Sequence, residues 1–386
     1  MSIPYFFSTG MARSGTNLLS KIISANSQVH AVLGSNIELY RFARDEILKI
    51  NFEYSELIPK SSGFSDFFGE PKFFDILTTI FNSKLDFQIN TKRFEQYFER
   101  GRLRIPQDSP DINKQKFKLH GKNFAELLDN YSEQIMKIRN LSSSIRIGFH
   151  ESWHIELFPA LNSLYPKAKF IVMLRDVRGS YASHKMDTEN SLAHRASLVS
   201  YARQFRKYAA LSKFFVANYD NFYLMKYENL MRDPNTEVKK LCEFLEIGFE
   251  EKMLDYNFHR DPFTNVVWQG NSGDKTLSVG FSETRNTKWK SNLNDLERRT
   301  LETLCRLSLL NLDYEIGEFN QRFPKDIKQF LTQSLSLEDR WKLPKLSNSS
   351  ITNQEISYFN ILQAQNKVEL KNSLLNFFSP EYFFFK

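Results

Sequence analysis

A glycine-containing loop that follows a strand-like apolar run constrains this chain more than any other feature. The apolar run covers Ile3 to Phe7, and residues 8–18 then read Ser-Thr-Gly-Met-Ala-Arg-Ser-Gly-Thr-Asn-Leu. The two glycines have the spacing of the phosphate-binding loop G-x-x-x-x-G-K-[ST], in which backbone N–H groups at a helix start hold phosphate oxygens. The pattern predicts a strand, an anion-binding loop and a helix, in that order.

The two residues that a nucleoside triphosphatase needs are missing from this loop. Thr16 stands where the phosphate-binding lysine would be, and Asn17 stands where a hydroxyl would hold Mg²⁺. The anion cradle is kept while the triphosphate and metal chemistry is lost, which favours a different phosphorylated ligand. A glycine-rich turn that only caps a helix is the simpler alternative.

Further strand-like runs predict the fold class. The runs are Tyr5–Ser8, Ile145–Phe149, Phe170–Leu174 and Phe222–Lys226. Most are followed by apolar residues at helical spacing, so we expect an α/β fold of three layers, with a mostly parallel central sheet between helices. We expect a domain over residues 1–325, a helical insertion at about 41–141, and a helical C-terminal extension over 326–386.

Polar residues follow the predicted strands at their carboxyl ends. The glycine loop follows the first strand, and His150, Arg175 and Tyr227 follow the next three. Ligands of open α/β sheets bind outside the carboxyl ends of the strands, so these residues are expected to meet in one crevice. Arg175 and Ser183 could hold a second phosphate between a guanidinium and a hydroxyl, although an Arg-Asp pair at a strand end can also be structural.

Composition and charge exclude several classes of protein. The only cysteines, Cys242 and Cys305, lack a C-x-x-C pattern, which excludes a disulfide framework or cysteine zinc site and predicts buried thiols. No leader-like segment or run of about 18 apolar residues occurs, which predicts no membrane segment and a cytoplasmic location. The net charge of +7 without a dense basic run favours an anionic small ligand over nucleic acid. A homodimer is compatible with the sequence, which contains no feature that decides the oligomeric state.

Four segments resemble, in order, motifs of the sulfotransferases that use 3′-phosphoadenosine 5′-phosphosulfate (PAPS). The motifs are the 5′-phosphosulfate loop, the 3′-phosphate motif, the strand and helix after it, and the Lys-Trp segment near the C-terminal cofactor loop. The matching segments are Thr9–Leu19, Phe170–Ser183, Phe222–Leu230 (with Asp233-Pro234 and Cys242–Leu245 after it) and Thr287–Lys290. The resemblance, partly to tyrosylprotein-type and bacterial members, covers about residues 3–315 and implies a fold like that of P-loop nucleoside triphosphatases.

The resemblance also implies a role for each matched residue. The 5′-phosphosulfate would be held by Arg13, Ser14, Gly15, Thr16 and Asn17, with Arg13 stabilising the charge that develops during transfer. The 3′-phosphate would be bound by Arg175 and Ser183, adenine would lie near Tyr227, and the nucleotide would be covered by Ser278, Arg285 and Lys288. The implied reaction is in-line transfer of SO₃ to a hydroxyl or amine, with adenosine 3′,5′-bisphosphate as product and no metal.

Two residues are candidates for the general base. In tyrosylprotein-type members a glutamate follows the first helix, and Glu38 approximates this position after a short insertion. A lysine ends the strand before the 3′-phosphate motif in those members, and His150 stands in its place. Whether His150 is a base, a sulfonate donor or neither stays open, and a solvated carboxylate at a helix start is the alternative for Glu38.

Two other functions compete with sulfuryl transfer. Residues 150–154, His-Glu-Ser-Trp-His, match the H-E-x-x-H motif of zinc hydrolases, which needs both histidines on one helix face. His150 is instead expected to close a strand. A nucleotide-binding protein without catalysis is the second alternative. No motif in residues 41–141 distinguishes a tyrosyl peptide, a saccharide, a lipid or a small alcohol as acceptor.

Overall fold

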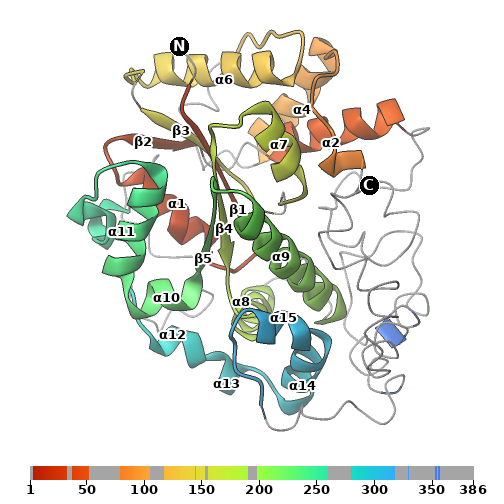
Figure 1. Cartoon of the computed structure of the whole chain (residues 1–386), viewed down its shortest axis with the longest axis vertical. Coiled ribbons are helices and arrows are strands. Elements are labelled where there is room, and N and C mark those ends of the chain that lie inside the picture. Colours follow the sequence, from red (N-terminus) through yellow and green to blue (C-terminus); the bar gives the residue numbers. More distant parts are fainter. Residues whose placement is uncertain are drawn as a thin grey trace.

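Five parallel strands form the centre of the molecule (Figure 1). The computed structural model describes residues 3–32, 37–51, 79–104, 117–143, 145–152, 155–189, 198–259, 280–317, 329, 353 and 355–356. The strands are β1 (Tyr5–Gly10), β2 (Val29–Val32), β3 (Arg146–His150), β4 (Lys169–Leu174) and β5 (Phe222–Lys226), in the spatial order β2-β3-β1-β4-β5. β1 lies in the middle, so the loop after it leaves the centre of the sheet.

Helices connect and flank the strands. In chain order they are α1 (Thr16–Ser24), α2 (Ile37–Asn51), α4 (Thr91–Arg104), α6 (Phe124–Ile138), η2 (Ile155–Leu157), α7 (Phe158–Leu164), α8 (Val177–Glu189), α9 (Leu198–Asn218), α10 (Tyr227–Arg232), α11 (Pro234–Leu245), η4 (Glu251–Met253), η5 (Tyr256–Phe258), α12 (Thr284–Thr287), α13 (Trp289–Asn292), α14 (Asp295–Leu304) and α15 (Arg306–Asn311).

Alternating side chains of β1 enter two separate hydrophobic cores. Tyr5 and Phe7 belong to the larger core, which α2, α6, α7 and α9 help to form. Phe6 belongs to the smaller core, which is built with α1, α10 and α11. Successive residues of a strand point to opposite faces, so the sheet is buried on both sides and the predicted three-layer α/β fold is confirmed.

A row of phenylalanines crosses four adjacent strands on the larger-core side. In the parallel register Phe7 pairs with Phe149 and with Phe170, and Phe170 pairs with Phe222. The rings of Phe7 and Phe170 are stacked with centroids 5.3 Å apart, and those of Phe170 and Phe222 are stacked at 4.6 Å. All four side chains are buried. This stacked row supports one register, which aligns the carboxyl ends of the strands.

The four strands predicted from the sequence are present, each within two residues of its expected ends. Strand β2 was not predicted. It has four residues, its His30 is only half-buried, and it pairs only with β3 among the described strands. Such a short edge strand is defined by its partner rather than by its own sequence pattern.

The expected helical insertion contains α2, α4 and α6 within its described residues. In the expected C-terminal extension, Asn353, Glu355 and Ile356 are helical, and the remainder of the helix predicted around Asn353–Phe377 lies outside the described residues. Both cysteines are buried free thiols, as predicted. Within the described part of the chain, no helix combines the length and apolarity required to cross a membrane.

Candidate functional site

The loop between β1 and α1 has a backbone that its glycines make possible. Gly15, at the start of α1, has a φ of 98°, and Arg13 also has a positive φ, of 65°. A β-carbon on Gly15 would lie 2.6 Å from the Tyr227 ring, and one on Gly10 would lie 2.5 Å from the carbonyl oxygen of Met173. Both glycines therefore permit a close approach that a larger residue would prevent.

Ser14 fastens the loop to the sheet. Its hydroxyl lies 2.8 Å from the Met11 carbonyl oxygen and 3.2 Å from that of Met173 in β4, and its N–H donates to the Met11 carbonyl. The side chain is fully buried. The predicted ligand-binding residue Ser14 therefore already uses both donors within the protein.

The first turn of α1 presents backbone N–H groups next to the loop. The N–H groups of Thr16, Asn17 and Leu18 belong to the first turn, where a helix offers no intrahelical acceptor. Among the described residues no side chain caps this end. Because the helix dipole places partial positive charge here, these N–H groups suit an anion.

The two predicted phosphate-binding groups meet at Arg13. Its Nε donates to the Ser183 hydroxyl at 3.2 Å, and its carbonyl oxygen accepts from Nη1 of Arg175 at 3.3 Å. The loop after β1 and the turn after β4 are thus joined by direct hydrogen bonds. These two segments, which are distant in the sequence, therefore lie together at the carboxyl ends of the strands, as predicted.

Arg175 carries a charge that suits an anionic ligand. Its guanidinium lies over the Tyr227 ring at 4.2 Å from the centroid, and Nη2 donates to the Arg285 carbonyl oxygen at 3.4 Å. In the described part of the chain its buried Nε has no hydrogen-bond partner, and no carboxylate is within ion-pair distance of it. Because its hydrogen bonds among the described residues go to backbone carbonyl oxygens, this guanidinium is suited to a phosphate.

The third predicted nucleotide-contacting segment lies partly within the described residues. Arg285, in α12, reaches Arg175 through its carbonyl oxygen. Lys288 connects α12 to α13 and is half-buried. Ser278 lies outside the described residues.

His150, the last residue of β3, is a buried neutral imidazole. Its Nδ1 lies 2.9 Å from the Ser8 hydroxyl oxygen in the neighbouring strand. Burial lowers the pKa of His150 to about 4, so it carries no charge near neutral pH. A neutral imidazole can accept a proton but provides no positive charge for a sulfonate. His150 also stands at the end of a strand, so the helix that an H-E-x-x-H zinc site requires does not begin there; His154 lies outside the described residues.

Glu38 lies in the first turn of α2 and is buried, with 5% of its surface exposed. Its Oε1 accepts from Nη1 of Arg41 at 2.5 Å. The alternative of a solvated carboxylate at a helix start is therefore wrong.

Helix α9 supports the loop through residues that the sequence analysis did not identify. The Tyr201 hydroxyl donates to the Ala12 carbonyl oxygen at 2.6 Å, and the Tyr208 hydroxyl lies 3.3 Å from the Thr9 hydroxyl. The two tyrosines are seven residues apart, which puts them on one face of a helix. This seven-residue spacing is the feature of the sequence from which the shared face of Tyr201 and Tyr208 could have been predicted.

The sequence that forms this site matches a known family. A sequence profile described as the sulfotransferase family matches residues 4–251, which is more than half of the chain. The chain belongs to the sulfotransferase family. Curated proteins give no significant match to this member of the family.

Solved sulfotransferase structures are similar to this family member at low identity. The sulfotransferase domain of a Synechococcus olefin synthase is 14% identical with a TM-score of 0.45, and the match covers 82% of this chain and 98% of that domain. A sulfotransferase from Alicyclobacillus acidocaldarius is 14% identical with a TM-score of 0.39 (86% and 99% covered). One from Mycobacterium avium is 14% identical with a TM-score of 0.40 (82% and 79% covered).

Proposed function

We propose that this protein transfers a sulfuryl group from PAPS to a hydroxyl or amine acceptor. The observation that carries the proposal is the direct contact between Arg13 of the anion-binding loop and both Arg175 and Ser183. The donor has an anionic group at each end of its ribose, and two adjacent anion-binding groups fit such a nucleotide. When bound, PAPS supplies the reactive sulfuryl group.

The proposed roles of Arg13, Ser14, Arg175 and Ser183 follow from their contacts, and those of Tyr227, Ser278, Arg285 and Lys288 come from the family resemblance. Arg13 and the first-turn N–H groups, to which Gly15, Thr16 and Asn17 contribute, hold the 5′-phosphosulfate, and Ser14 shapes the loop. Arg175 and Ser183 bind the 3′-phosphate. Tyr227 lies beside the adenine, and Ser278, Arg285 and Lys288 cover the nucleotide.

Two residues compete for the acceptor proton. As the new bond between sulfur and the acceptor oxygen or nitrogen forms, the bond from sulfur to the phosphate oxygen breaks, and the acceptor proton passes to a base. Neutral His150 and ion-paired Glu38 can each accept it. The residues of the insertion, at about 41–141, would shape the acceptor site.

Ligand binding tests the nucleotide assignment. In the presence of a chelator, adenosine 3′,5′-bisphosphate should raise the melting temperature much more than ADP does. A ligand at about 100 times its Kd adds about 2.7 kcal/mol of stability, which a thermal shift assay detects readily. Equal shifts from the two nucleotides, with or without Mg²⁺, would contradict a 3′-phosphate site.

Substitution of Arg13 tests catalysis. The assay uses labelled PAPS and a panel of acceptors that contains a tyrosyl peptide, a saccharide, a lipid and a small alcohol. Arg13→Ala should lower sulfuryl transfer by about 10²-fold or more, because a group that stabilises the developing charge is lost. Arg298→Ala is the matched control, since Arg298 pairs with Asp295 in α14. Full turnover by folded R13A would refute the assignment. Binding without transfer to any acceptor would favour the non-catalytic alternative.

A further inference from the structure

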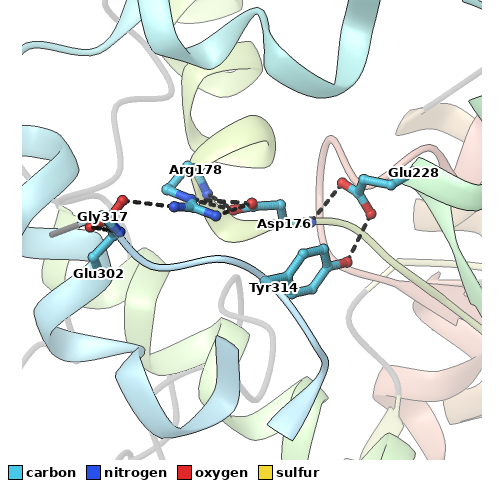
Figure 2. A network of polar contacts seen from close by, with 6 residues as sticks. All are labelled: Asp176, Arg178, Glu228, Glu302, Tyr314 and Gly317. Carbon is cyan, nitrogen blue, oxygen red and sulfur yellow. Dashed lines mark hydrogen bonds and ion pairs between the residues drawn. The ribbon is translucent and has the colours of Figure 1, made fainter. Parts of the chain in front are cut away.

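Glu228 belongs to a polar network that also contains Asp176, Arg178, Glu302, Tyr314 and Gly317 (Figure 2). It is the second residue of α10 and is partly buried. Its Oε1 accepts from the Asp176 N–H at 3.0 Å, and its Oε2 accepts from the Tyr314 hydroxyl at 2.8 Å. Its carbonyl oxygen accepts from Nδ2 of Asn286 at 3.0 Å. One residue therefore joins three segments that are distant in sequence.

Two of these three contacts involve residues that directly follow an arginine of the candidate nucleotide site. Asp176 directly follows Arg175, and Asn286 directly follows Arg285. Tyr227, which precedes Glu228, lies under the Arg175 guanidinium. Glu228 thereby fixes the backbone on both sides of the hydrogen bond between Arg175 and the Arg285 carbonyl.

The other side of the same turn is fixed by Arg178. Its guanidinium forms ion pairs with Asp176 at 2.6 Å and with Glu302 at 2.7 Å, and Glu302 accepts from the Gly317 N–H (Figure 2). The guanidinium also lies over the Trp289 ring, next to Lys288, at 4.2 Å. The turn after β4 is thus held from both sides by contacts with later parts of the chain.

In the free protein the Glu228 carboxylate has a favourable Coulombic interaction with Arg175, but this does not explain its presence beside a bound anion. A negative side chain near a phosphate site weakens anion binding by Coulomb repulsion. The benefit of Glu228 must then be geometric, because it accepts two hydrogen bonds that hold the turn and Tyr314.

We propose that Glu228, held by Tyr314, is the positioning residue of the 3′-phosphate site, which orients Arg175 before the nucleotide binds. The inference rests on the proposed function. It differs from an electrostatic role in the sign of its effect: removing the charge should weaken 3′-phosphate binding, whereas repulsion alone predicts tighter binding. It also predicts that loss of the neutral Tyr314 hydroxyl acts in the same direction.

Calorimetric titration with adenosine 3′,5′-bisphosphate and with 5′-AMP tests this on the full chain. The preference is the Kd for 5′-AMP divided by that for adenosine 3′,5′-bisphosphate. It should fall about tenfold in Glu228→Gln, whose amide keeps one acceptor oxygen in place of two, and about threefold in Tyr314→Phe, which loses the hydroxyl donor. A tenfold fall corresponds to about 1.4 kcal/mol. Affinity for 5′-AMP should change little. Glu243→Gln, an exposed charge on α11, and Tyr223→Phe, on β5, should leave the preference unchanged.

The outcomes separate this inference from the proposed function. A wild-type protein that binds both nucleotides equally would overturn the proposed function and the inference together. A wild type that prefers adenosine 3′,5′-bisphosphate, with an unchanged or increased preference in both variants, would overturn the inference alone. If melting shows that E228Q does not fold, Y314F decides by itself.

Discussion

At the scale of single residues, His150 combines a candidate catalytic position with a perturbed acid–base equilibrium. Its place at the end of β3 could be predicted from the apolar run before it. Its pKa could not, because the shift arises from burial of the side chain by the fold. Glu38 is a similar case. Its ion-pair partner Arg41 is only three residues away in the sequence, but its burial depends on the tertiary structure.

The buried imidazole predicts a specific pH dependence of stability. The folded-state pKa of about 4 lies below the ordinary value of 6.5, so the contribution of neutral His150 is fully present above pH 6.5 and is lost as pH falls toward 4. Between about pH 7 and about pH 4.5, wild type should lose about 2–3 kcal/mol of unfolding free energy that His150→Asn does not lose. Urea denaturation of both proteins at the two pH values measures this. Parallel losses would show that His150 is not the titrating group.

At the scale of elements, the row of phenylalanines sets the register of the sheet and hence of the site. The four strands that carry these residues could be predicted, because continuous apolar runs are typical of strands buried on both faces. The stacking between Phe7, Phe170 and Phe222 depends on strand order, which no local pattern contains.

Removal of the central ring should be costly. Phe170→Ala should lower the free energy of unfolding by about 3–5 kcal/mol, since it creates a cavity between two stacked neighbours, whereas Phe170→Leu should cost less because more of the volume is kept. Phe258→Ala, at a side chain with 54% of its surface exposed, is the control. Chemical denaturation gives all three values. A small effect of F170A would mean that the row does not stabilise the sheet.

At the scale of the whole molecule, the C-terminal extension contacts the domain that carries the site. Glu355 is 3% exposed and pairs with Arg206 of α9. Its carboxylate accepts from Nη2 of Arg206 at 2.7 Å and from Nη1 at 2.9 Å. Ile356 packs against the larger core. Because α9 also contacts the loop between β1 and α1 through Tyr201, Glu355 and Ile356 are connected to the candidate site by one helix. The boundary at residue 325 between the sulfotransferase domain and the C-terminal extension stays a prediction.

The Glu355 contact gives that division a test. Glu355→Gln should lower the free energy of unfolding by about 3 kcal/mol, because breaking a buried ion pair leaves a charge poorly compensated. Glu283→Gln, at an exposed position in the loop before α12, should have little effect. Urea denaturation measures both. If E355Q and a chain ending at residue 325 were both as stable as wild type, the extension would be a separate unit.

The sequence alone determined the loop, its glycines, the strands that carry the site residues and the family resemblance. The loop and the strands follow from backbone sterics and side-chain periodicity, which act over a few neighbouring residues, whereas the resemblance rests on the four matched segments. Only the tertiary structure decided that Arg13 contacts Arg175 and Ser183, that burial lowers the pKa of His150, and that Glu228 contacts Tyr314 and the residues next to Arg175 and Arg285. Those properties come from burial and from contacts between residues far apart in the chain, which local sequence patterns do not encode.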